Sequence, residues 1–171
     1  MTDHQISSIL RTLHEEHMAT IAMLERLEAL LRRQGAASPP ASGDKEAAAL
    51  LGDLVVMLED EITHHYAFEE KYLFPKFSEH YDPGIPMMLQ GEHETIRPLA
   101  ESAAGLARTA GTGGFTPEAW KEFHELAAEI VEREVFHVQK EEMGFLPALN
   151  QVMDPDLEKE LSLAYSELKG G

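Results

Sequence analysis

The chain has 171 residues and an apolar content of 43%, which is about the size of one ordinary domain with enough apolar side chains to fill a core. It contains no cysteine, which excludes disulfide bonds, thiolate metal sites, cysteine-held iron–sulfur clusters and thiol redox chemistry. A net charge of −17 disfavours nucleic acid and anionic membranes as partners, and the lack of a signal-peptide pattern or a long apolar run predicts a cytoplasmic protein.

Three clusters of glycine and proline, at 35–43, 74–86 and 111–117, separate segments that lack the alternating pattern of β-strands. The first segment, about 7–34, is predicted to be a helix. Its apolar stripe, with spacings of three and four, contains one histidine and consists of Leu10, Leu13, His17, Thr20, Leu24, Leu27 and Leu31. A histidine therefore occupies a core position.

The second predicted helix, about 44–74, ends before Pro75, because proline breaks a continuing helix. Both a histidine and a glutamate interrupt its stripe, which comprises Leu51, Val55, Leu58, Ile62, His65, Glu69 and Tyr72. The third, about 84–110, again places one histidine among apolar residues, in the stripe Leu89, His93, Ile96, Ala100, Ala103 and Ala107.

The fourth predicted helix begins after Thr116 as N-cap, with Pro117 at its first position, and stops after Leu146 because Pro147 follows. A histidine and two glutamates lie on its stripe, which comprises Trp120, Phe123, Ala127, Ile130, Glu134, His137 and Glu141. All four stripes therefore combine an apolar majority with a polar minority.

A short helix at about 156–169 is expected to pack across one end of the bundle, without a chemical role. The prediction is thus an all-α, up-down-up-down four-helix bundle over about 7–147 with a short C-terminal fifth helix, in one domain that spans 1–171. From the helical rise, the polar core residues on either side of each connection lie at similar distances from it, about 14 Å at one end and about 26–31 Å at the other. These residues should meet in one layer.

The sequence contains an internal repeat. The segments HYAFEEKYLFP (65–75) and HVQKEEMGFLP (137–147) align without gaps as H-x-x-x-E-E-x-x-[LF]-[LF]-P. The partner helices also match, because Glu16-His17 and Glu92-His93 occupy similar places in them. Residues four apart share one face of a helix, so each H-x-x-x-E pair can offer a nitrogen and a carboxylate to one centre.

Any single histidine on an apolar face is more simply explained as a core residue with one hydrogen bond. Four imidazoles and two carboxylates in one buried layer are different, because without partners they would cost several kcal/mol. Metal coordination removes this cost. The sequence therefore predicts a buried metal site built from His17, His65, Glu69, His93, His137 and Glu141.

These residues resemble the ligand motifs of the hemerythrin-like, or HHE cation-binding, domain, and the resemblance covers all four helices, about 7–147. It implies two iron ions (Fe2+/Fe3+) between the helices, bridged by two carboxylates and by a solvent-derived oxo, hydroxo or water ligand. In this chain the resemblance makes Glu69 and Glu141 the bridges and the four histidines the terminal ligands.

The oxygen-carrying hemerythrins, which the chain also resembles, differ from it at two places. They have a second histidine one turn after that of the third helix, where this chain has Arg97, and a longer His-to-Asp spacing in the fourth helix, where it has His137 and Glu141. The implied count of donors then leaves an open position on each iron. Histidine and carboxylate suit iron better than calcium or magnesium, and an iron pair can bind O2, NO or peroxide.

Three further residues lie near the predicted layer. Glu134, on the stripe of the fourth helix, could fill an open iron position or hydrogen-bond an imidazole. Glu61, one turn before His65, could accept its free N–H, although a solvated glutamate fits as well. His14, on the flank of the first stripe, is an extra ligand, an outer hydrogen-bond donor or, most simply, a partly exposed histidine.

A ferritin-like di-iron bundle is the closest structural alternative, since that class uses Glu-x-x-His pairs. The pairs Glu61/His64 and Glu134/His137 have this spacing. They are out of register in the repeat, where His137 aligns with His65, so they do not form a symmetric site.

The functional expectation is a non-haem di-iron protein that binds O2 or a related ligand such as NO or peroxide, in sensing, storage or the response to oxidative or nitrosative stress. A di-iron enzyme that consumes H2O2 or reduces O2 is one alternative, and an iron-handling or ferritin-like protein is another. No signalling module is recognisable in the sequence, so a separate redox or signalling partner is expected.

Overall fold

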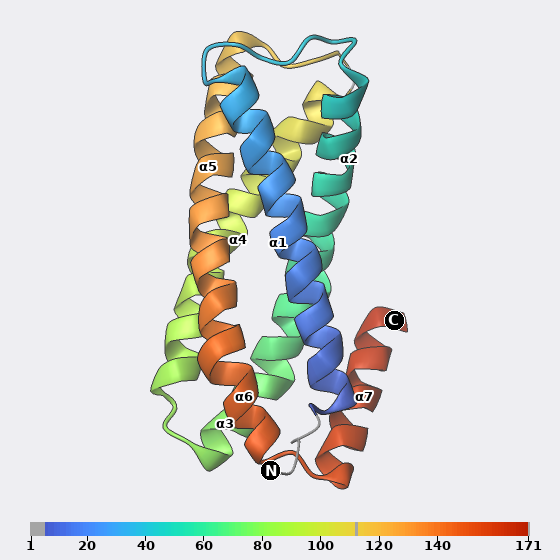
Figure 1. Cartoon of the computed structure of the whole chain (residues 1–171), viewed down its shortest axis with the longest axis vertical. Helices are drawn as coiled ribbons and strands as arrows, with labels where there is room; N and C mark the ends of the chain where they lie inside the picture. The colour runs from blue at the N-terminus through green and yellow to red at the C-terminus, as the bar shows by residue number, and fades with distance from the viewer. Residues whose placement is uncertain (1–5, 112, 171) are drawn as a thin grey trace.

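The computed structural model of the chain describes residues 6–111 and 113–170. Four long helices alternate in direction along one axis (Figure 1): α1 (Ser8–Gln34), α2 (Lys45–Asp60), α4 (Gly84–Ala110) and α5 (Pro117–Lys140). No strand occurs within the described ranges. The predicted all-α, up-down-up-down bundle is confirmed.

Side-chain caps fix where three of the long helices begin. Ser7, Asp44 and Thr116 each accept a hydrogen bond from the backbone N–H three residues later. Pro117 follows at the start of α5, where a missing N–H costs nothing. The start predicted for the fourth helix is therefore confirmed.

The sequence predicted that Pro75 and Pro147 end the second and fourth helices, and this is wrong. The second run of helix continues from α2 through two π-helical segments, η1 (Glu61–Tyr66) and η2 (Glu69–Leu73), into α3 (Phe74–His80). The fourth run continues from α5 through one π-helical segment, η3 (Glu141–Phe145), into α6 (Leu146–Gln151). Just before each proline, Phe74 and Leu146 donate their N–H to the carbonyl five residues earlier. This wider turn keeps the chain helical where proline offers no N–H and its ring needs room.

The π-helical segments also change which face of the second helical run is buried. Each adds a residue to a turn and rotates the later part of the run by about 100° relative to an uninterrupted α-helix. The predicted stripe therefore fails locally, because Ile62 and Tyr72 are only partly buried, whereas Tyr66 and Phe68 are enclosed. Val55 is also only partly buried, but it lies in α2, before both π-helical segments. In the other three runs the predicted stripes are buried throughout.

Two apolar clusters fill the bundle, one on each side of a polar layer. The larger lies toward the 35–44 loop and includes Leu27, Leu54 and Trp120. The other lies toward the start of α1 and is rich in aromatic side chains: Phe68, Phe74, Phe77 and Phe145. The polar layer therefore sits inside the bundle rather than at one of its ends.

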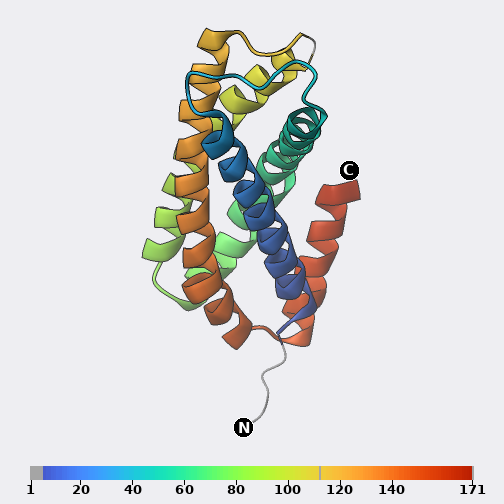
Figure 2. The same cartoon turned by 45° about the horizontal axis from the view of Figure 1, so that its top comes forward.

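The last helix, α7 (Pro155–Gly170), packs along the first half of α1 rather than across the end of the bundle, as Figures 1 and 2 show. Its Glu158 accepts the backbone N–H of Ile9 at 2.9 Å, so it satisfies one of the free donors at the start of α1. Leu157 and Leu161 are buried beneath it. The fifth helix is thus present, with a different placement from the one predicted.

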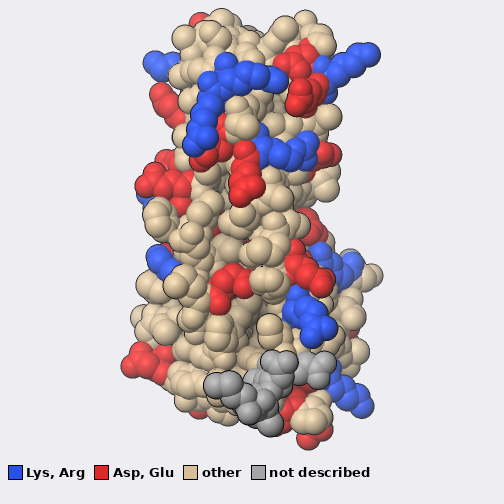
Figure 3. All heavy atoms as spheres, viewed as in Figure 1, with Lys and Arg blue, Asp and Glu red and all other residues tan. Residues whose placement is uncertain are grey.

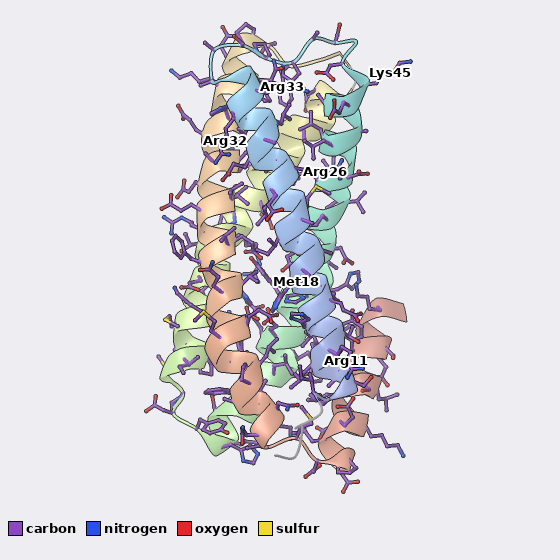
Figure 4. The ribbon with its side chains drawn as sticks, in the orientation of Figure 1. Arg11, Met18, Arg26, Arg32, Arg33 and Lys45 are labelled. Atoms are coloured by element: carbon purple, nitrogen blue, oxygen red, sulfur yellow. The ribbon has the colours of Figure 1, made fainter. Side chains whose placement is uncertain are left out.

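The outer surface carries charges of both signs. On the face drawn in Figure 3, acidic and basic side chains are interspersed among uncharged ones. Arg11, Arg26 and Arg32 are exposed and point outward from α1 (Figure 4). None of the described helices combines the length and the apolar character that a membrane span needs.

Candidate metal centre

Six ionisable side chains from all four helical runs meet in the polar layer. One histidine comes from α1, one from α4, and each repeat adds a histidine and a glutamate: His17, His93, His65, Glu69, His137 and Glu141. None of the six is more than 2% exposed. Met18, labelled in Figure 4, marks the level of the layer along α1. The structure brings together every residue that the sequence predicted to meet.

The six side chains form two groups of four that share both glutamates. His17 and His65 belong to one group, His93 and His137 to the other, and within each group one ligand atom of every residue lies within 4.8 Å of the others. The Nε2 atoms of the paired histidines are 3.1 Å and 3.0 Å apart. Two atoms bound at right angles to one ion, each at about 2.1 Å, would be about 3.0 Å apart. Each group therefore has the dimensions of a shared coordination sphere.

The two glutamates face both groups. Oε1 of Glu69 lies 3.2 Å from Nε2 of His65 and 3.5 Å from Nε2 of His93, and Glu141 approaches one histidine of each group in the same way. All four of their carboxylate oxygens are nevertheless buried without a hydrogen-bond partner. Such atoms are costly to bury, and a cation in each group removes the cost. The donor set therefore fits a pair of metal ions.

The profile of the hemerythrin HHE cation-binding domain matches residues 8–149, which is most of the chain. The chain belongs to the hemerythrin HHE cation-binding family. Comparison with curated proteins gives no match. The resemblance drawn from the ligand motifs is thus confirmed at the level of the family, and the two groups described above are where this HHE domain could hold cations.

Each histidine of the HHE centre also contacts a further carboxylate through its Nδ1 atom. The Nδ1 atoms face carboxylate oxygens at 2.5–3.4 Å in the pairs His17–Glu142, His65–Glu16, His93–Glu70 and His137–Glu92. A carboxylate that accepts the Nδ1 hydrogen fixes the ring and leaves Nε2 free to bind a metal. Every pair joins two different helical runs, so the HHE centre cross-links the bundle.

These four glutamates were missed by reasoning from the apolar stripes, although the repeat contains them. Glu16 and Glu92 precede the histidines of α1 and α4, and Glu70 and Glu142 are the second members of the E-E pairs. The doubled E-H and E-E pairs, present in both halves, were the signal that could have found them. The chain neighbour of a ligand points about 100° away from it and therefore falls off the core stripe.

The outer carboxylates are in turn tied to residues nearer the surface. Arg97 donates to both oxygens of Glu70, at 2.9 and 3.1 Å, and His14, whose side chain is 46% exposed, contacts Glu142 at 2.7 Å. Neither Arg97 nor His14 reaches the two groups, so both act on the HHE centre only through a glutamate. Tyr165 of α7 donates to Glu16 in the same manner, which gives the last helix a contact with the centre that was not expected.

A second set of polar side chains lies beside the HHE centre, on the side of the larger apolar cluster. Tyr66 donates to Oε2 of Glu134 at 2.6 Å, and Thr20 donates to Oε2 of Glu61 at 3.3 Å. Both glutamates are less than a tenth exposed, and the Oε1 atom of each lacks a hydrogen-bond partner. Glu134 thus bonds a tyrosine instead of an imidazole, and Glu61 approaches Nε2 of His65, at 3.9 Å, instead of accepting its Nδ1 hydrogen.

The electrostatics of the metal-free layer favour bound protons. Burial alone lowers the pKa of His17 and of His137, but nearby carboxylates, above all Glu141, outweigh it and raise these pKa values to about 10 and about 11. Two carboxylates this close do not both ionise easily, so burial and the charge of Glu141 raise the pKa of Glu69. A metal ion must displace these protons, and its binding should therefore release them.

Removal of an outer carboxylate should weaken metal binding without removing a ligand. In Glu142→Ala the ring of His17 loses the acceptor of its Nδ1 hydrogen, and we expect the affinity for the metal to fall about 10- to 100-fold. Competition with a chelator of known affinity measures the change. Glu101→Ala, at an exposed position on α4, is the control. Equal affinities of the two variants would contradict the assigned role.

Proposed function

We propose that the chain is a non-haem di-iron protein in which four histidines and two bridging glutamates hold the metal pair. His17 and His65 would bind one ion, His93 and His137 the other, and both glutamates would be common to the two, with a solvent-derived oxygen as a further bridge. The observation that carries the proposal is that the two four-residue groups share Glu69 and Glu141. Among the residues that the structure describes, no other group of three or more such donors is found.

Iron suits this donor set better than other metals. Calcium and magnesium prefer all-oxygen shells, and the chain has no thiolate, whereas imidazole with carboxylate is typical of non-haem iron sites. An iron pair of this kind supplies open positions where a small molecule can bind and exchange electrons. We therefore propose that the protein binds O2, NO or peroxide in the cytoplasm, in sensing, storage or stress response, and acts with a separate redox or signalling protein.

Consumption of H2O2 or of O2 is the second candidate function, and the position of Arg97 favours it. The guanidinium is bound to Glu70 and supplies no ligand where an additional histidine would complete the shell of one iron. The structure does not favour a ferritin-like site. His64, which the Glu-x-x-His pattern would need in the layer, contacts Asp60 at 2.7 Å instead.

Protein purified from iron-fed cells should contain about two irons per chain, since six buried donors and a bridging oxygen exceed what one ion needs. Elemental analysis against quantitative amino-acid analysis measures the ratio. A ratio near one, or full occupancy by zinc under these conditions, would count against the di-iron proposal.

A further inference from the structure

The two four-residue groups of the HHE centre have matching ligands but different surroundings. The first group contains His17 and His65, the second contains His93 and His137, and both share the two glutamates. Each histidine has one outer carboxylate, so each group has two of them. A difference between the groups can therefore arise from what these carboxylates contact in turn.

The internal repeat extends to one of these further contacts. His14 and Gln90 each lie three residues before the histidine of their helix. His14 contacts Glu142 at 2.7 Å in the first group, and Gln90 donates to Glu70 at 2.9 Å in the second. In both groups, one outer carboxylate thus has a polar partner from the same place in the repeat.

The second group has two cations that the repeat does not supply to the first. The guanidinium of Arg97 donates to both oxygens of Glu70, at 2.9 and 3.1 Å, and the ammonium of Lys140 donates to Glu92. These two glutamates are the outer carboxylates of the second group. Each of them therefore has a positive charge directly on it.

The positions that match these cations in the other half of the repeat are apolar. When the halves are aligned on their ligands, Ile21 stands opposite Arg97, and Phe68 stands opposite Lys140. The ligands and their outer carboxylates occur in both halves, whereas the two cations occur in one half only. Holding a metal ion in a group therefore does not require them, and they need a separate explanation.

Among the described residues, one Lys or Arg lies within 4 Å of an outer carboxylate of the first group. Nζ of Lys169 is 3.9 Å from Glu16, but it lies closer to Asp60, at 3.1 and 3.3 Å from its two oxygens. The hydrogen bond to Glu16 comes from the hydroxyl of Tyr165 instead. The outer carboxylates of the first group therefore have less positive charge on them than those of the second.

This difference in charge acts on bound metal ions. A carboxylate that accepts the hydrogen of a ligating imidazole makes the imidazole a stronger donor, and a cation on the same carboxylate opposes this effect. The cation also repels the metal ion, more strongly when the ion carries more charge. The comparison does not depend on the ionisation of any ligand or outer carboxylate, because the two groups contain equal numbers of both. Arg97 and Lys140 carry positive charge at neutral pH.

We infer that Arg97 and Lys140 act through their glutamates to make the two groups unequal, so that the first group takes the more highly charged ion of an unequal pair. Both are positioning residues. The inference rests on the proposed di-iron function and deepens it: in a pair of one ferric and one ferrous ion, the ferric ion would lie with His17 and His65.

The test uses two ions that do not change oxidation state and whose X-ray absorption edges differ. Metal-free protein is loaded with one equivalent each of gallium(III), supplied as citrate, and zinc(II), and is then crystallised. Loading takes place at about pH 8, where a free imidazole is mostly neutral. Anomalous scattering on both sides of each edge gives the occupancy of each element in each group.

In the wild type, gallium should occupy the first group about tenfold more often than the second, which corresponds to about 1.4 kcal/mol. A larger ratio is not expected, because the side chains of Arg97 and Lys140 are 30% and 43% exposed and solvent screens part of their charge. Total zinc and gallium content is measured in the same crystals.

The variant that tests the two cations combines Arg97→Gln with Lys140→Gln. The new amides can still donate to the same carboxylates, so the ratio should fall to about threefold or less through the loss of charge alone. Lys140→Gln alone, at an exposed position, should shift the ratio in the same direction and serves if the double variant folds poorly. Arg133→Gln is the control, because Arg133 donates to Glu129, which is not an outer carboxylate of the centre.

Equal occupancy of the two groups by gallium, gallium mainly in the second group, or no gallium in either would overturn the inference. A double variant that binds less of both metals at an unchanged ratio would overturn it as well. Iron content is measured in a separate sample of each protein. Fewer than about two irons per chain in the wild type would refute the di-iron proposal itself, whereas two irons with a gallium ratio near one would refute only the inequality of the groups.

Discussion

Stripping iron from the protein is expected to lower its melting temperature by about 8–16 °C. A ligand present at about a thousand times its dissociation constant stabilises the folded state by about 4 kcal/mol, and each kcal/mol shifts the melting temperature of a domain of this size by about 2–4 °C. In the metal-free layer the four carboxylate oxygens of Glu69 and Glu141 are buried without hydrogen-bond partners. No hydrogen bond therefore compensates these oxygens for the loss of the cations.

The gap between loaded and stripped protein should widen as the pH rises. In the metal-free protein, protonated His17 and His137 stabilise the fold fully below the unfolded pKa of 6.5, and this stabilisation is lost as the pH rises through about 10 and about 11. The loaded protein has no such protons to lose. Calorimetry of both forms at about pH 7 and about pH 9 measures the gap. Superimposable melting curves of loaded protein and verified apoprotein would show that the layer is satisfied without metal.

Replacement of Glu69 or Glu141 by alanine should reduce the iron content from about two per chain to well below about one. Each of these glutamates belongs to both four-residue groups, so one substitution removes a donor from both ions. Elemental analysis of the purified variants measures the effect. Glu69→Gln is a second variant that keeps the volume of the side chain but removes its charge, and it should lose iron as well.

The matched controls are His64→Ala and His124→Ala, which remove imidazoles outside the layer. His64 contacts Asp60, and Nε2 of His124 contacts the carbonyl of Leu31 at 3.1 Å. Both controls should keep the iron content of the wild type, and circular dichroism should show the same helix content in all the variants. If all four alanine variants lost iron equally, the assignment of the bridging glutamates would fail.

The long helices could be predicted because their buried faces follow one regular spacing and their first residues are ordinary caps, such as Thr116 with Pro117. The π-helical turns could not. A π turn has no characteristic amino-acid composition from which it could be predicted. Here the turns η2 and η3 meet two requirements at once: they leave room for Pro75 or Pro147, and they align a glutamate with the histidines of other helices. Ile62 and Tyr66 lie in the other π-helical segment, η1, where Tyr66 and not Ile62 is enclosed beside the centre.

The six central residues could be predicted because a histidine or a glutamate among leucines and alanines is conspicuous. The residues that support them could not be predicted, because a glutamate outside the apolar stripe gains its role only from the helix that faces it in the fold. Glu142 and Glu16 gain theirs only when α1 lies against η3 and η1. Tyr165 gains its contact with Glu16 from a placement of α7 that helical periodicity does not specify.

Because Glu69 and Glu141 belong to both four-residue groups, the first ion of the proposed pair would prepare the site of the second. It orients two of the four donors of the other group, and it drives the proton from Glu69, whose pKa is raised in the metal-free layer. Coupling between two sites is reciprocal, so this preparation is the same whichever group fills first. Loading should therefore be positively cooperative. A population short of iron would consist mostly of empty and doubly loaded chains, with few that hold a single ion.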